Sequence, residues 1–259
     1  MHIKALALRQ QVLGEEHPET IQSLGNLATT YYVQGRYSEA EPMHIKALAL
    51  RQQGRYSEAE PMHIKALALR QQVLGEEHPE TIQSLASLAA TYYAQGRYSE
   101  AEPMEVKALA LRQQVLGEEH PETIQSLGNL ATTYYVQGRY SEAEPMHIKA
   151  LALRQQVLGE EHPETIQSLA SLAATYSAQG RYSEAEPMEV KALALRQQVL
   201  GEEHPETIHS LAGLAATYHA QGRYEEAETI QAQASELQEQ VKASELQNQV
   251  LRGEDPDAI

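Results

Sequence analysis

A short block, His-Pro-Glu-Thr-Ile, recurs along the chain and begins at His17, His78, His120, His162 and His204. The last four starts are 42 residues apart, whereas the first interval is 61 residues, which is 19 more. A fixed period of about 20 to 50 residues is typical of repeat architectures, in which each unit stacks on its neighbours. The period therefore predicts a stacked array rather than one globular core.

The longer first interval comes from a duplicated segment. Residues 35–53 read GRYSEAEPMHIKALALRQQ, and residues 54–72 repeat them letter for letter. The regular units also alternate between two versions, one with LGNLATTYYVQ and MHIK and the other with LASLAATY and MEVK. Near-identity across a two-unit block indicates either recent expansion or a designed consensus array.

The two ends of the chain depart from this pattern. The first four residues match residues 43–46, so the chain starts inside a second helix, and its last residues resemble a linker into another unit. We therefore expect a segment of a longer array. Its predicted parts are a partial N-terminal repeat (1–16), repeat 1 (17–53), a duplicated second helix (54–77), repeat 2 (78–119), repeat 3 (120–161), repeat 4 (162–203), and repeat 5 with an extended C-terminal helix and the start of a further unit (204–259).

The first half of each unit has the features of a helix. Pro18 suits the first helical position because its missing N–H has no partner there, and Glu19 favours the positive end of the helix. Apolar residues then recur at spacings of three and four: Ile21, Leu24, Leu27, Ala28 and Tyr31. This spacing predicts one buried helical face. Gly35 is expected to end the helix in the left-handed conformation.

The second half of each unit predicts another helix. Ser38-x-x-Glu41 is a capping box, and Pro42 is tolerable at the edge of the first turn. The expected inner face consists of Ala40, Met43, Ala47 and Leu48. In the duplicated copy the helix should cover about 57–73 and end at Gly75. Because the connections are short, the two helices should pack antiparallel, and neighbouring pairs must stack to bury their apolar faces.

Composition limits the partners and the compartment. The formal net charge is −16, and so acidic a chain repels nucleic acids and anionic membrane surfaces. The chain has no Cys, which excludes disulfides and thiolate metal sites and favours a reducing, cytoplasmic compartment. No apolar run approaches the roughly 20 residues of a membrane helix, and the N-terminus lacks the features of a secretory leader.

Several of these residues match a known family. Leu24-x-x-Leu27-Ala28-x-x-Tyr31, followed by Ala40 and Ala47, resembles the tetratricopeptide pattern. The 42-residue period, with Tyr-x-x-Gln-Gly-Arg-Tyr-Ser-Glu-Ala-Glu-Pro and Leu-Gly-Glu-Glu-His-Pro, is similar to the kinesin light chain subtype over nearly the whole chain. The resemblance implies an all-α, right-handed α-solenoid of antiparallel helix pairs that acts as a non-enzymatic protein-binding scaffold.

One departure from that family concerns the second helix. Where the family has an aromatic residue, this chain has His or Glu: His44, His63, Glu105, His147 and Glu189. Burying an unpaired charge is costly, so each Glu must reach the surface or find a partner. We expect looser packing in this layer. We also expect a weak point near Gly54, where two second-type helices follow one another, and uniform hydrogen-exchange protection across 38–73 would contradict it.

No catalytic, cofactor or metal site is predicted. Each His-Pro-Glu linker offers a single His, whereas zinc needs several converging ligands, and His209 and His219 are spaced unfavourably for sharing one. No glycine-rich phosphate loop is present. The recurring arginines of the Gln-Gly-Arg-Tyr turns are expected to pair with nearby acids and carbonyls, and the adjacent tyrosines to pack between helices.

The resemblance places ligand binding in a concave groove lined by the first helices. By that analogy the groove residues are Gln22, Asn26, Thr29, Tyr32, Gln83, Ser87, Tyr93, Gln125, Asn129, Thr132, Tyr135, Gln167, Ser171, His209 and His219. Asn26 and Asn129 match the asparagines that hold a peptide backbone in the family. Several differences between otherwise near-identical units fall in this set, as expected for a surface that is free to vary.

Three functions remain open at this point. The first is a scaffold that binds a protein or peptide segment in the groove, where the scarcity of charge favours a peptide recognised by Asn, Gln and Tyr. The second is a kinesin light chain-like cargo adaptor, which also needs a coiled coil to join a motor. The third is a sensor or oligomerisation array of a nucleotide-binding, immune-type receptor.

Overall fold

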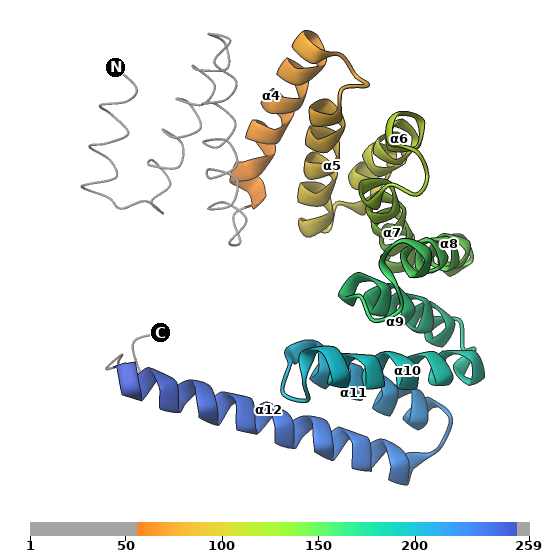
Figure 1. Cartoon of the computed structure of the whole chain (residues 1–259), viewed down its shortest axis with the longest axis vertical. Helices are drawn as coiled ribbons and strands as arrows, with labels where there is room; N and C mark the ends of the chain where they lie inside the picture. The colour runs from red at the N-terminus through yellow and green to blue at the C-terminus, as the bar shows by residue number, and fades with distance from the viewer. Residues whose placement is uncertain (1–55, 253–259) are drawn as a thin grey trace. The chain divides into compact units, whose positions relative to one another are not determined.

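The computed structural model describes residues 56–252, and side chains over 60–244. Every element in that range is an α-helix (Figure 1). They are α4 (Tyr56–Leu74), α5 (Pro79–Ala94), α6 (Tyr98–Leu116), α7 (Pro121–Val136), α8 (Tyr140–Leu158), α9 (Pro163–Ala178), α10 (Tyr182–Leu200), α11 (Pro205–Ala220) and α12 (Tyr224–Arg252). The chain forms two compact units, residues 1–115 and 116–259. The all-helical repeat architecture expected from the sequence is thus confirmed.

The first unit contains α4, α5 and α6 among its described elements. Helix α4 covers the duplicated helix expected at about 57–73 and packs against α5. Its Leu67 joins a core with residues of α5 and α6: Ile82, Leu85, Leu88, Tyr92, Ala101 and Ala108. The duplicated helix therefore supplies the apolar contact that a regular second helix would supply. The expected weak point near Gly54 lies outside the described residues.

The second unit contains α7 to α12, and each of these helices packs on the next one in the chain. Its first core combines Leu151 of α8 with residues of the following helix pair: Ile166, Leu169, Leu172, Tyr176, Ala185 and Ala192. A second core joins Leu193 of α10 to Leu211, Leu214, Ala234 and Leu237 of the last pair. Each core thus spans two repeats, which confirms that stacking buries the apolar faces.

The first helices begin with a cap that the sequence reasoning missed. The Nδ1 atom of His162 accepts a hydrogen bond from the backbone N–H of Glu164 at 3.2 Å, and Pro163 takes the first helical position as expected. The same N-cap bond recurs at His78, His120 and His204. The recurring histidine therefore stabilises the helix start by occupying one of its unpaired N–H groups.

The capping box expected for the second helices is wrong. Ser38 and Glu41 lie outside the described residues, but in the copy at Ser141 the helix already begins at Tyr140, so the serine is inside the first turn. The N-cap residue is Arg139, without a side-chain cap bond. The motif glutamate of that copy, Glu144, instead accepts hydrogen bonds from Arg181 and Gln179 of the next repeat. Charge-assisted bonds of this kind are stronger than a neutral cap.

Two glycines offer a matched test of the helix ends. Gly180 follows α9 with φ +77°, and a Cβ there meets nothing within 4 Å, so only backbone strain opposes a side chain. Gly213 lies inside α11 and is equally open. We expect Gly180→Ala to lower the free energy of unfolding by about 1–2 kcal/mol. Gly213→Ala should raise it by about 0.5–1 kcal/mol. Urea denaturation measures both, and changes of the same sign would contradict the assignment.

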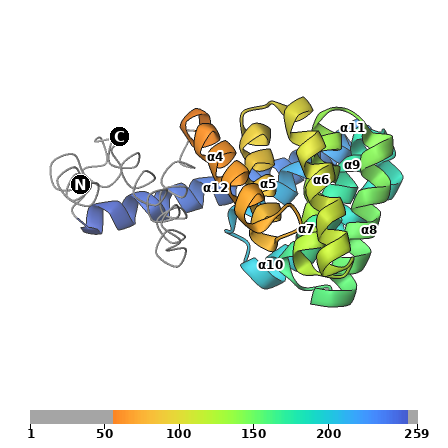
Figure 2. The ribbon, with the colours of Figure 1, turned by 90° about the horizontal axis from the view of Figure 1, so that it is seen from above.

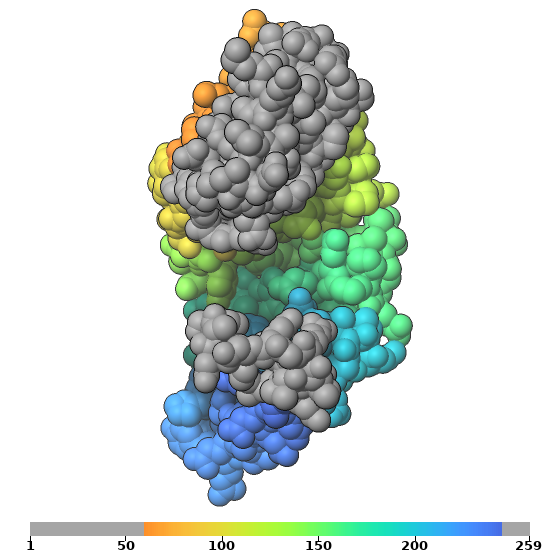
Figure 3. Space-filling model, turned by 90° about the vertical axis from the view of Figure 1, so that its left-hand side faces the viewer, coloured from red at the N-terminus to blue at the C-terminus, as the bar shows by residue number. Residues whose placement is uncertain are grey.

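Helix α12 is longer and more polar than the other second helices. It has 29 residues where α10 has 19, and it runs back along α11 and projects past the first turn of that helix (Figure 1). Figure 2 shows the same projection from above. Ala227, Ala234 and Leu237 are buried. The positions that correspond to Leu193 and Arg196 of α10 are Ser235 and Gln238, which are exposed, and blue side chains of α12 form part of the surface in Figure 3. The last helix is therefore longer than α10 and more exposed at these two positions.

Candidate functional site

The residues expected to line the groove lie on α5 in the first unit and on α7, α9 and α11 in the second, and those of the second unit define the first-helix face. Six of them are exposed: Gln83, Gln125, Asn129, Gln167, His209 and His219. Five are partly buried: Ser87, Tyr93, Thr132, Tyr135 and Ser171. Gln22, Asn26, Thr29 and Tyr32 lie outside the described residues. The described members thus have solvent-accessible side chains, but their contacts show that several also hold the fold together.

The glutamines of this face are bound by buried arginines that the sequence reasoning did not single out. The Nη2 atom of Arg154 donates to Oε1 of Gln125 at 2.7 Å, and its Nη1 atom donates to Oγ of Ser168 at 2.6 Å. Arg196 makes the same contacts to Gln167 and Ser210 at 2.6 Å. Each arginine therefore joins the first helix of its own repeat to that of the next.

These arginines occupy the apolar stripe of the second helix. Arg196 follows Ala192 at helical spacing, and its side chain is 4 % exposed. Burial lowers the pKa of Arg196, and the nearby Glu206 carboxylate opposes this shift. A cation that recurs at an apolar position of a helix is the signal that could have identified this clamp from the sequence.

The aromatic positions of the face are partly structural. The ring of Tyr135 packs against Tyr140 with centroids 5.4 Å apart, and burial raises the pKa of Tyr135. Tyr93 packs against Tyr98 at 5.2 Å in the same way. The equivalent residue of repeat 4 is Ser177, so this ring pair is missing there. The tyrosines beside the turns therefore pack between helices, as expected.

The layer that departs from the family pattern is largely buried, and the looser packing expected there stays a prediction. His147 is only 3 % exposed, and burial together with Arg154 lowers its pKa to about 4. In the next repeat Glu189 Oε1 accepts hydrogen bonds from Ser177 and Thr217, at 3.2 and 3.0 Å. Burial raises the pKa of Glu189. The Oε2 atom of Glu189 is buried without a hydrogen-bond partner among the described residues, so hydrogen bonding offsets only part of the cost of burying this carboxyl group.

The arginines of the turns connect consecutive repeats. Arg181 donates to Glu144 of the preceding repeat at 2.8 Å and to Glu184 of its own repeat at 2.6 Å. Its guanidinium lies over the ring of Tyr176, 4.1 Å from the centroid. Arg223 repeats this arrangement with Glu186, Glu226 and Tyr218. The expected pairing with nearby acids is confirmed, and these arginines carry no free charge for a ligand.

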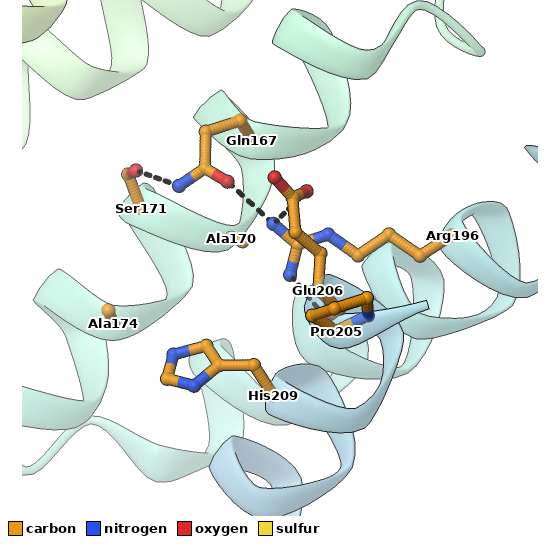
Figure 4. A pocket seen from close by; sticks show the side chains of 8 residues that line it. All are labelled: Gln167, Ala170, Ser171, Ala174, Arg196, Pro205, Glu206 and His209. Atoms are coloured by element: carbon orange, nitrogen blue, oxygen red, sulfur yellow. Dashed lines mark hydrogen bonds and ion pairs between the residues drawn. The ribbon is translucent and has the colours of Figure 1, made fainter. Parts of the chain in front are cut away.

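A pocket opens on the first-helix face of the second unit, between repeats 4 and 5. It has a volume of about 470 Å³ and is lined by Gln167, Ala170, Ser171, Ala174, Arg196, Pro205, Glu206 and His209. Figure 4 shows the residues of α9 facing those of α11, with Arg196 behind them. Concave sites with a few placed polar groups are the usual setting for ligand binding.

Other site types lack support in the described part of the chain. Among the side chains of residues 60–244, no three of His, Asp or Glu converge in a way that could hold a metal ion. None of the helices within residues 56–252 is long and apolar enough to cross a membrane. The His-Pro-Glu linkers, considered above as ligand sources, act there as helix caps.

Comparison with known families decides the classification. A family model described as tetratricopeptide repeat matches residues 1–53, 43–114, 106–147, 127–198 and 190–240. The chain belongs to the tetratricopeptide repeat family. No curated protein sequence matches it significantly.

Solved structures of tetratricopeptide arrays are similar to this chain. A variant of a kinesin light chain candidate from Podospora anserina with nearly identical repeats is 28 % identical, with a TM-score of 0.66, and the match covers 88 % of this chain and 98 % of that one. BtubC (BKLC) of P. vanneervenii is 22 % identical, with a TM-score of 0.71 and coverage of 86 % and 89 %. MamA is 17 % identical, with a TM-score of 0.53 and coverage of 74 % and 94 %. The last two matches concern the fold alone.

These comparisons confirm the kinesin light chain-like tetratricopeptide solenoid expected from the sequence. Repeat arrays of this family are generally non-enzymatic scaffolds for protein interaction, and the comparisons support that role for this chain.

Proposed function

We propose that the chain binds an extended peptide or protein segment along the first-helix face. The observation that carries this proposal is the pocket of about 470 Å³ between α9 and α11, which lies among the predicted groove residues. The face also keeps unused hydrogen-bonding groups. The amide of Asn129, for example, is exposed, and within the described part of the chain its one side-chain hydrogen bond is accepted from Gln125 Nε2, at 2.7 Å. Such groups can pair with the backbone of a bound segment.

Differences between the repeats support the same face. The equivalent positions in repeats 3, 4 and 5 are Asn129, Ser171 and Gly213. A second such series is Tyr135, Ser177 and His219. The fully buried isoleucines Ile124 and Ile166, in contrast, are the same in repeats 3 and 4. The second helices also differ, at His147 and Glu189, but most differences between repeats 3 and 4 fall on the first helix, which fits a surface that recognises different parts of one ligand.

The proposal predicts which substitutions abolish binding. In a pull-down from lysate, the double variant Asn129→Ala and Tyr135→Ala should lose at least about tenfold of the captured partner, since truncated interface anchors often cost about 1–2 kcal/mol each. Circular dichroism checks that the variant is folded, because Tyr135 also contacts Tyr140. The control is Lys149→Ala on α8, which removes an exposed ion pair with Glu118. Unchanged capture by the double variant contradicts the proposal.

A further inference from the structure

The pocket between α9 and α11 has its positive charge inside and its negative charge outside. The Arg196 side chain is 4 % exposed, whereas the Glu206 side chain is 52 % exposed. Nη1 and Nη2 of Arg196 donate to Ser210, the Glu206 carbonyl and Gln167. Both nitrogens are therefore directed to the protein, whereas Nε is buried without a hydrogen-bond partner among the described residues. A ligand in the pocket thus does not encounter an exposed cation there.

The pocket instead offers acceptors. The closest charged contact of the Glu206 carboxylate is Nη2 of Arg196, at 3.5 Å from its Oε2, which leaves most of its lone pairs for a ligand. His209 is exposed, and no hydrogen bond or ion pair of its ring occurs among the described residues. Figure 4 shows its ring directed toward Ala174. A carboxylate and an imidazole on one wall suit a donor, and in particular a cation.

Three further residues that line the pocket are apolar. Ala170 and Ala174 of α9 and Pro205 of α11 supply carbon surface beside these acceptors. Lys and Arg side chains combine an alkyl stem with a charged head, and they bury the stem on apolar surface while the head finds polar partners. The pocket therefore has both the apolar surface for the alkyl stem and the hydrogen-bond acceptors for the charged head of a long basic side chain.

The charges near repeat 5 also favour a cationic ligand. Glu160, in the linker before repeat 4, pairs with Lys191 of repeat 4 at 2.9 Å. The residue of repeat 5 that corresponds to Lys191 is Gln233, so the matching Glu202 loses its cation. Glu202 is exposed and lies in the turn that leads to the pocket wall. The end of the first-helix face next to the pocket is thus more negative than the equivalent part of repeat 4.

We propose that this pocket accepts a lysine or arginine side chain of a bound peptide, with its charged head at Glu206 and its stem against Ala170, Ala174 and Pro205. This inference rests on the proposed function of the first-helix face, and it specifies the chemistry of the ligand at one position. The net charge of −16 adds long-range attraction for a basic segment.

The test uses a random peptide library displayed on phage and selected against the full chain. Selected peptides are synthesised with a fluorescent label, and their affinity is measured by anisotropy at two salt concentrations. We expect the peptides to share a Lys or Arg at one aligned position. Replacing that residue with Met, or Glu206 with Gln, should weaken binding about tenfold, and added salt should weaken wild-type binding.

A matched control is available one repeat earlier. Glu164 occupies the position of Glu206 and contacts the buried Arg154 at 3.3 Å, with the same side-chain exposure of 52 %. The positions of Ala170 and Ala174 are Gly128 and the polar Thr132 in that repeat, so the carbon surface for a basic stem is smaller there. Glu164→Gln should for this reason leave the affinity unchanged. Selected peptides without a shared basic residue, or equal affinities for wild type and Glu206→Gln, overturn this inference alone. If no peptide is selected, or if Ser171→Trp does not block the selected peptides, the proposed function fails and the inference fails with it.

Discussion

Replacing Arg154 with Ala is expected to lower the free energy of unfolding by about 3 kcal/mol, which is large for one residue of a stacked array. The guanidinium is nearly buried and bridges Gln125 of α7 and Ser168 of α9, at 2.7 and 2.6 Å. Its loss leaves the buried Ser168 hydroxyl without this donor. It also opens a cavity beside Gly128, where a Cβ added to the glycine would lie 3.8 Å from Nη1. The contact between two consecutive repeats is then weakened directly.

Two further variants separate the causes of this loss. Lys149→Ala on the same helix removes an exposed ion pair with Glu118, and we expect a change of at most about 1 kcal/mol. Arg154→Met keeps much of the stem but none of the hydrogen bonds. Urea denaturation followed by circular dichroism gives the stabilities, and hydrogen exchange in α9 reports the local effect. If Arg154→Met is as stable as wild type, packing alone and not hydrogen bonding holds this junction.

The helical framework could be predicted from local signals because those signals act within a few residues. Pro163 at the helix start and Gly180 at the helix end fix their backbone conformation wherever the repeats pack. The spacing of Ile166, Leu169 and Leu172 likewise specified one buried face before any neighbour was known. These positions depend on chain geometry and hydrophobic burial, which the sequence displays directly.

The contacts between repeats could not be predicted in the same way. Glu144 looked like half of a capping box, yet its carboxylate reaches Arg181 in the next repeat, a partner 37 residues away. Arg154 gave no local signal of its burial, because a charged side chain is usually exposed. Its burial depends on Ser168, which is 14 residues farther along the chain, and no local rule connects the two. The pocket beside Glu206 likewise exists only through the juxtaposition of α9 and α11.

Acidification is expected to destabilise the array through His147. The buried ring has a pKa of about 4, whereas a histidine in an unfolded chain titrates near 6.5. Between these two pH values the unfolded chain binds more protons than the folded chain, so the free energy of unfolding falls as the pH drops from 6.5 to 4. Above pH 6.5 the ring is neutral in both states, and His147 causes no loss of stability. A shift of this size corresponds to about 3 kcal/mol. Its cause is burial first and the charge of Arg154 second.

The pH profiles of two variants isolate this effect from the general change in charge. Urea denaturation at about pH 7 and about pH 4.5 should show a smaller loss for His147→Leu than for wild type, by about 2–3 kcal/mol. Glu189, at the same position one repeat later, should respond in the opposite sense because burial raises its pKa. A group of this kind destabilises the folded chain when it is ionised, so Glu189→Gln should be more stable than wild type at neutral pH, and its advantage should shrink on acidification. Parallel pH profiles for wild type and His147→Leu would show that the buried imidazole does not control the acid response.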